Sequence, residues 1–348
     1  MPANHLEDTS VMAPIRTVTG DIDPDAIRGV VASFTHLAPD WRPISDRDPE
    51  IDLPSETRLA AARAAGEQLH HVVASSARRG VGLIVDATSP GAGRDPMRLH
   101  DIAASTGMAI VACTGAHAPP VRLARVEDRS AEYLAEWFAF EIGNGMAAIA
   151  GDPFRGVSLM SERAAGVAGD ALNDAAVRAG AIRITLASPT IDRVDGALID
   201  AAAMTAGATG VATFLDAPST TNLEAIATRF EGMGANRSRI VLAPGNRTPD
   251  ALLAAASLGL AVIVTAPATT AEGAVAIWEG TVRGFLRHGL IDHLIATVSI
   301  SGMSDGALID HARPPGLSVL SHAIAGVDDV AMHAVATSNA VRVLGIIE

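Results

Sequence analysis

The stretch "AIRITLASPTIDRVDGALIDAAAMTAGATGVATFLD", residues 181–216, decides the fold. It begins with a short apolar run, "AIRITLA", and ends with another, "GVATFLD" at 210–216. Between them, "DGALIDAAAMTAGA" places apolar residues at helical spacing. A strand, a helix and a second strand in this order are typical of a parallel βαβ unit, because two parallel strands need a crossover between them.

The same alternation extends through the chain in both directions. Six further short runs rich in Val and Ile are separated by Ala-rich segments of helical period: "VVASFTH" (30–36), "VGLIVDAT" (81–88), "AIVACTG" (109–115), "RIVLAPG" (239–245), "LAVIVTA" (260–266) and "IATVSIS" (295–301). Eight strands, each followed by a helix, predict an α/β protein with a closed (β/α)8 TIM barrel. We expect a single domain over 1–348, with the barrel at about 29–330 and C-terminal helices to 348.

Two points of architecture have alternatives. An open doubly wound sheet would carry a G-x-G-x-x-G turn after its first strand, and only an incomplete "GAG" occurs, at 91–93. The run "RGVSLMSE" at 155–162 competes with 181–187 for the fourth barrel strand. Helix spacing favours 181–187, which predicts an inserted segment near 147–178.

Composition limits the classes of partner. The formal net charge is -13 with 26 basic residues, which argues against nucleic-acid binding. No apolar run approaches the roughly 18 residues of a membrane span, and the first residues lack a secretory pattern. We therefore expect a cytoplasmic protein that contacts no membrane. The single Cys113 suits a reducing compartment and is interpreted as a core residue.

Several blocks of the chain resemble, in order and spacing, the phosphotriesterase family of the amidohydrolase superfamily: "TVTGDI" (17–22), "GVVASFTHL" (29–37), "GVGLIVDATSPGAGRD" (80–95), "TGMAIVACTGAH" (106–117), "VRAGAIRI" (177–184), "ATGVATFLD" (208–216), "SRIVLAPG" (238–245) and "ATSNAVRVLGI" (336–346). The resemblance covers nearly the whole chain except 147–178. It implies a TIM barrel and a homodimer. Fold does not fix function, so the site is compared residue by residue.

The resemblance implies two divalent metals, usually zinc, held by a His-x-His pair, a carboxylated lysine, two further histidines and an aspartate. This chain keeps His36 of the pair and replaces the other five positions, in that order, with Phe34, Arg183, Asp216, Pro244 and Ser301. Arg183 cannot form the bridging ligand and stays cationic. Most metal ligands are thus replaced, so we expect no cofactor, and zinc only if the family site were retained.

The residues at the expected barrel mouth suggest different chemistry. Arg183 and Asp216 end neighbouring strands, so a bidentate ion pair is predicted. We assign catalytic roles to His36, Arg183 and Asp216: Arg183 would bind the carboxylate or phosphate group of a small molecule, and His36 or Asp216 would act as general acid or base. The residues predicted to contact substrate are Phe34, Thr88, His117, Asn246, Ser299 and Ser301. Arg94 is predicted to brace its loop through an ion pair with Asp95.

Three functions fit these residues. The first is a metal-independent enzyme acting on a small carbonyl, carboxylate or ester compound. The second is a non-catalytic pseudoenzyme that binds a small ligand or a partner. The third is a metal-dependent lactone or phosphoester hydrolase with a reduced, mononuclear site. Phe34 and Pro244 weigh against the third, because both are apolar at positions where the family has ligands.

Overall fold

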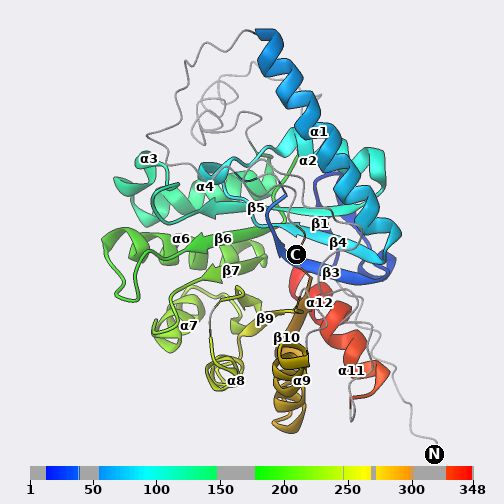
Figure 1. Cartoon of the computed structure of the whole chain (residues 1–348). Coiled ribbons are helices and arrows are strands. Elements are labelled where there is room, and N and C mark those ends of the chain that lie inside the picture. The colour runs from blue at the N-terminus through cyan, green and yellow to red at the C-terminus, as the bar shows by residue number, and fades with distance from the viewer. Residues whose placement is uncertain are drawn as a thin grey trace, which may run out of the picture.

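Eight parallel strands form one sheet that curves into a nearly closed barrel in the computed structural model (Figure 1). The structure describes residues 13–37, 39, 55–146, 177–245, 247–267, 272–298, 300 and 327–346. The strands lie in chain order around the barrel: β3 Val30–Thr35, β4 Val81–Asp86, β5 Ala109–Ala116, β6 Ala181–Thr185, β7 Ala212–Asp216, β8 Ile240–Leu242, β9 Ala261–Thr265 and β10 Leu294–Thr297. This arrangement confirms the predicted TIM barrel, with 181–185 as the fourth barrel strand. The predicted insertion and the run at 155–162 lie outside the described residues, apart from 177 and 178.

Helices cover the outside of the sheet (Figure 1). They are α1 Ser55–Arg78, α2 Pro96–Thr106, α3 Ala124–Glu127, α4 Ala131–Gly143, α6 Arg193–Thr209, α7 Leu223–Gly232, α8 Pro249–Ser257, α9 Glu272–Arg287, α11 Asp329–His333 and α12 Asn339–Leu344. Among these described helices, none combines the length and apolarity that a membrane span requires.

Local sequence signals begin and end these helices. Asp192 caps the N-terminus of α6 by accepting a hydrogen bond from the backbone N–H of Asp195, and Gly210 ends the helix with φ +68°. Asp95 caps α2 in the same way, with Pro96 in the first turn. These caps and the terminal glycine fix where the helices begin and end, and so where the next strand begins.

The alternation of side chains along each strand separates two apolar clusters. On β5, Val111 and Cys113 belong to the cluster inside the barrel, while Ile110 packs outside against the helices. On β6, Ala181 faces inward, so Arg183, two residues later, faces inward too. Burial raises the pKa of the Cys113 thiol, which supports its interpretation as a core residue.

Segments distant in sequence complete the barrel. The backbone N–H of Ser33 on β3 donates to Thr297 Oγ1 on β10 at 2.8 Å, across the point where the sheet closes. A short hairpin that we did not predict, β1 Ile15–Thr17 and β2 Gly20–Ile22, precedes the barrel. Ile15 also forms an antiparallel bridge to Gly345, so the beginning and the end of the described chain lie together.

A buried ion pair joins β5 to its surrounding helices. Arg94 donates to both carboxylate oxygens of Glu141 on α4, at 2.7 and 2.6 Å, and to the carbonyl oxygen of Cys113 at 3.0 Å. Thr114 Oγ1 donates to the same carboxylate at 2.6 Å. The predicted pairing of Arg94 with Asp95 is therefore wrong. Asp95 is engaged in capping α2, and a partner on a distant helix leaves no local pattern in the sequence.

Candidate functional site

Arg183 lies inside the barrel near the carboxyl ends of the strands and is only 1% exposed. Its neighbours in register are Gly115 on β5 and Phe214 on β7. Gly115 has φ +112°, and a Cβ atom there would lie 2.0 Å from the carbonyl oxygen of Arg183. Glycine is therefore required where β5 passes this residue.

Arg183 pairs with Asp216 at the end of the neighbouring strand, as predicted. Arg183 Nη2 donates to Asp216 Oδ2 at 3.0 Å, and the Asp216 side chain is 36% exposed. The predicted bidentate geometry is wrong, because a single nitrogen makes this contact. Among the residues that the structure describes, Nε and Nη1 of Arg183 are buried without a hydrogen-bond partner. Two unsatisfied donors on a buried cation are costly, so this guanidinium is suited to donate hydrogen bonds to a further oxygen atom.

Aromatic rings surround this cation. The guanidinium carbon of Arg183 lies 5.3 Å from the centre of the Phe34 ring, within the range of a cation–π contact. Phe34 meets the ring of His36 edge-on at 5.4 Å and that of Phe214 at 6.2 Å. Phe34, predicted to contact substrate, thus lies between the arginine and the retained histidine.

Two histidines near Arg183 are held neutral. Burial, with a smaller contribution from the positive charge of Arg183, lowers the pKa of His36 to about 3. Burial and Arg183 also lower the pKa of His117 to about 4, while Asp216 acts in the opposite direction. Both imidazoles are neutral at pH 7 and each can take up a proton, but their low pKa values make them weak bases in the resting protein.

His117 is held by its own loop. Its Nδ1 lies 3.1 Å from the carbonyl oxygen of Ala118, and because a carbonyl can only accept, Nδ1 carries the proton. Arg122 Nε donates to the carbonyl oxygen of His117 at 2.9 Å, and Arg122 Nη2 donates to the buried Asp195 at 2.6 Å. These contacts fix the loop after β5 against α6.

Thr88 and His36 meet beside Asp86, a carboxylate that sequence reasoning missed. Thr88 Oγ1 donates to Asp86 Oδ1 at 2.6 Å and lies 3.5 Å from His36 Nδ1. Asp86 is 2% exposed, and burial raises its pKa. The available signal was the acidic residue inside the otherwise apolar run at 81–88. Arg247 was also missed; it donates to the carbonyl oxygen of Ala217, next to Asp216.

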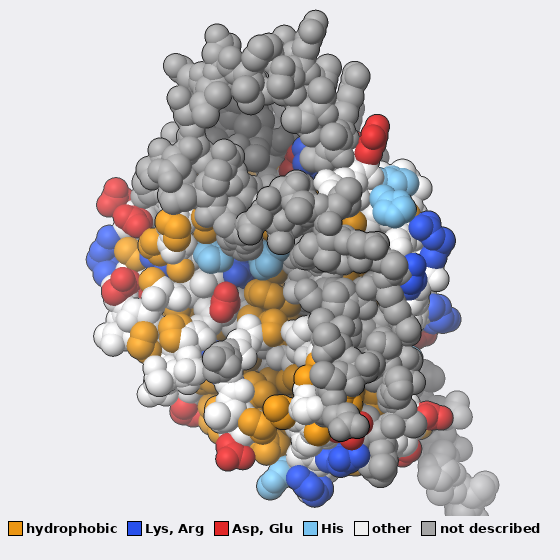
Figure 2. Space-filling view, in the orientation of Figure 1, with side chains coloured by type: hydrophobic (Ala, Val, Ile, Leu, Met, Phe, Trp, Pro, Cys, Tyr) orange, Lys and Arg blue, Asp and Glu red, His pale blue; other side chains and the backbone are white. Residues whose placement is uncertain are grey.

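The structure thus brings together six of the predicted site residues: Phe34, His36, Thr88, His117, Arg183 and Asp216. The other three, Asn246, Ser299 and Ser301, lie outside the described residues and stay predictions. In the space-filling view, histidine, cationic and acidic side chains gather within a largely hydrophobic area of one face (Figure 2).

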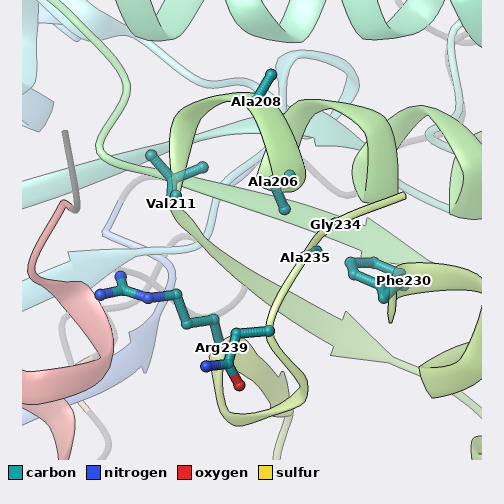
Figure 3. A pocket seen from close by; sticks show the side chains of 10 residues that line it. Ala206, Ala208, Val211, Phe230, Gly234, Ala235 and Arg239 are labelled. Carbon is teal, nitrogen blue, oxygen red and sulfur yellow. The ribbon is translucent and has the colours of Figure 1, made fainter. Parts of the chain in front are cut away.

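A separate pocket of about 300 Å³ lies between the end of α6 and the segment after α7 (Figure 3). Ala206, Phe230 and Arg239 line it. Arg239 extends towards the C-terminal helix, where its Nη1 donates to the carbonyl oxygens of Val343 and Gly345. None of the predicted site residues lines this pocket, and it lies near the amino ends of the strands, a region of the barrel associated with stability.

Comparison with known proteins agrees with this architecture. Residues 13–151 match the sequence model of the phosphotriesterase family. The chain is similar in structure to a solved protein described under "Molecular Engineering of Organophosphate Hydrolysis Activity from a Weak Promiscuous Lactonase Template". The TM-score is 0.67 and the sequence identity is 18%, and the alignment covers 95% of this chain and 100% of the other. The first part of the chain is therefore similar to the phosphotriesterase family, and the chain shares its barrel fold with the solved structure. An uncharacterized protein of Mycoplasma pneumoniae is 26% identical over 238 residues, 68% of this chain, and the match spans 61% of that relative's length.

The match to the phosphotriesterase family model covers only part of the site. It includes β3, β4 and β5, and therefore His36, Asp86 and His117. Arg183 and Asp216 lie beyond its end. The ion pair at the mouth is thus described by the geometry of this chain and not by the family match.

Among the residues that the structure describes, the side chains at the site do not match the metal ligands that the resemblance implies. In the described part of the chain, no group of three or more His, Cys, Asp or Glu side chains could hold a metal ion. The cationic guanidinium of Arg183 contacts Asp216, and its charge opposes a bound cation. Pro244, which follows β8, offers no side-chain donor.

Acidification should destabilise the fold through His36. In the unfolded chain a histidine takes up its proton below about pH 6.5, whereas folded His36 does so only near pH 3. His36 therefore leaves the free energy of unfolding unchanged above about pH 6.5. As the pH falls from there towards 3, the free energy of unfolding decreases by about 1.4 kcal/mol per pH unit. Urea unfolding at pH 7, 6 and 5 measures this slope.

The matched variant for this measurement is His36→Gln, which cannot titrate. We expect its free energy of unfolding to depend less steeply on pH between 7 and 5 than that of the unaltered protein. Equal slopes for the two proteins would contradict the low pKa of His36.

Proposed function

We propose that this chain is a metal-independent enzyme that acts on a small carbonyl, carboxylate or ester compound at the barrel mouth. The observation that carries the proposal is the buried Arg183 guanidinium, which pairs with Asp216 through one nitrogen and has two further N–H donors without a partner among the described residues. An oxygen of a carbonyl or carboxylate group would satisfy these donors. Hydrogen bonds to a cation are among the stronger ones in proteins.

The neighbouring groups supply the remaining chemistry for an ester or lactone. His36, neutral at pH 7, takes a proton from water as the water oxygen bonds to the carbonyl carbon. The carbonyl oxygen becomes an oxyanion, which the Arg183 donors stabilise. The carbon–oxygen bond to the leaving group then breaks, and the leaving oxygen takes the proton from His36. Asp216 orients the guanidinium throughout and, being partly exposed, is the alternative base.

Metal content and turnover measured on one preparation test the proposal. The protein is expressed with added zinc and manganese, purified without chelator, and analysed by elemental mass spectrometry. The same sample is assayed on a panel of small lactones and aryl esters, before and after treatment with a chelator. We expect turnover that the chelator leaves unchanged. Turnover that requires one or two metal ions per chain would overturn the proposal and support a metal-dependent hydrolase.

A binding protein without catalysis is the second candidate. Phe34 lies over Arg183, which is only 1% exposed, and this packing favours a closed, structural arrangement of the pair. Calorimetric titration with acetate and benzoate separates the candidates. Saturable binding with no turnover on the panel would favour a ligand-binding role.

A further inference from the structure

We propose that Asp86, acting through the Thr88 hydroxyl, holds His36 in the tautomer that carries its proton on Nδ1, so that Nε2 is the basic nitrogen. Asp86 and Thr88 are then positioning residues for His36. This changes the role of Thr88, which the sequence alone assigned to substrate binding. The inference rests on the proposed function only for its effect on turnover, because the tautomer itself is a property of the resting protein.

The Thr88 hydroxyl lies next to a carboxylate oxygen of Asp86. Asp86 Oδ1 accepts from Thr88 Oγ1 at 2.6 Å, from the backbone N–H of Leu37 at 3.2 Å and from that of Thr88 at 3.3 Å. An oxygen that accepts two backbone N–H groups is an acceptor, whether the other carboxylate oxygen is protonated or not. The hydroxyl proton of Thr88 therefore points to Asp86.

The imidazole ring of His36 lies on the other side of the Thr88 contact. A threonine hydroxyl has one proton, and here Asp86 receives it. Towards His36 Nδ1, 3.5 Å away, Thr88 Oγ1 can then only accept. A hydrogen bond between these two atoms requires the proton of the neutral ring to be on Nδ1, which leaves the lone pair on Nε2. In an imidazole the hydrogen bond made by one nitrogen sets the state of the other.

Strand geometry keeps the three groups together. Thr35 of β3 pairs in register with Asp86 of β4, so His36 leaves the end of its strand directly beside the carboxylate. Thr35 Oγ1 also donates to the carbonyl oxygen of Val85 at 2.9 Å, which ties the two strand ends. The contacts among Asp86, Thr88 and His36 thus depend on the pairing of two strand ends, and not on a loop alone.

Nitrogen-15 NMR of the full-length, histidine-labelled protein at pH 7 tests the inference. Long-range proton–nitrogen correlations distinguish a ring nitrogen that carries a proton from one that does not. We expect His36 to show a protonated Nδ1 and an unprotonated Nε2. His117, whose Nδ1 faces the Ala118 carbonyl oxygen, gives the same pattern in the same spectrum and is the internal reference. A proton on His36 Nε2 in the unaltered protein would overturn the inference without any variant.

Two variants show whether Thr88 is the cause. Thr88→Val removes the hydroxyl and keeps the shape, and we expect His36 to lose its single tautomer while His117 is unchanged. Thr88→Ser keeps the hydroxyl and should keep the tautomer. Where the panel yields turnover, kcat/KM should fall about tenfold or more in Thr88→Val and recover in Thr88→Ser. An unchanged His36 pattern in Thr88→Val would refute the role of Thr88, whereas the absence of turnover with the predicted spectra would refute the proposed function alone.

Discussion

Arg183→Met is expected to lower kcat/KM for the lactone or ester that the protein turns over by at least about a hundredfold, the usual cost of losing one oxyanion donor. The barrel should stay folded. Methionine is apolar and of similar length, and it would pack among Phe34 and Phe214, which already contact this position. Asp216 would lose its partner, but its side chain is 36% exposed and can be hydrated. The measurements are steady-state kinetics and circular dichroism.

Controls separate charge from packing in this experiment. Arg183→Lys keeps a cation but loses the planar donors, so we expect only partial activity. Arg229→Met removes an arginine from a partly exposed pair with Asp200 on the helices and should leave turnover unchanged. If Arg183→Met unfolds, the ion pair is structural. If it retains full turnover, Arg183 has no part in the mechanism.

The largest effect on stability is expected from Glu141→Ala. Arg94 would remain buried without its carboxylate, because its side chain is 3% exposed. Removing one partner of a buried pair typically costs about 3–5 kcal/mol. Thr114 would lose an acceptor as well. Urea or guanidinium unfolding at pH 7, followed by fluorescence of the tryptophans, measures the loss.

A matched surface pair provides the comparison for Glu141. Glu279→Ala breaks the ion pair with Arg283 on α9, where both side chains are partly exposed, and should change the free energy of unfolding by less than about 1 kcal/mol. A double variant, Arg94→Met with Glu141→Leu, should recover much of the lost stability, because no uncompensated charge remains. A loss below about 1 kcal/mol in Glu141→Ala would show that water reaches Arg94.

The barrel could be predicted from sequence because its signal is repeated. Each strand is a short Val- and Ile-rich run that a helix follows. A wrong assignment of one run would therefore have left seven strands that still predict the same fold. The hairpin β1–β2 was missed for the opposite reason: strands of three residues leave almost no periodicity. The fourth strand was identified because the spacing to the next helix allowed only one ordinary unit.

The site was predictable only where strand order brings residues together. Arg183 lies on β6 and Asp216 ends the adjacent β7, so their contact could be expected from the fold. The number of hydrogen bonds between them depends on side-chain rotamers and could not be predicted. The Asp86–Thr88–His36 contacts depend on one hydroxyl direction, which no sequence pattern encodes. Arg94 pairs with Glu141, 47 positions away, and not with the adjacent Asp95, because Asp95 caps α2. No sequence pattern indicates a partner at that distance.

The bridge between Ile15 and Gly345 has a consequence for how the protein folds. This bridge and the contact between Ser33 and Thr297 both join the first described elements to the last, so neither can form until nearly the whole chain has been synthesised. Contacts of such long sequence separation slow folding, because a large loop must close before they contribute. During translation, the edge of β3 that will contact β10 stays unpaired until β10 has been synthesised. Its early pairing with β4 would protect the other edge of β3 from aggregation in that interval.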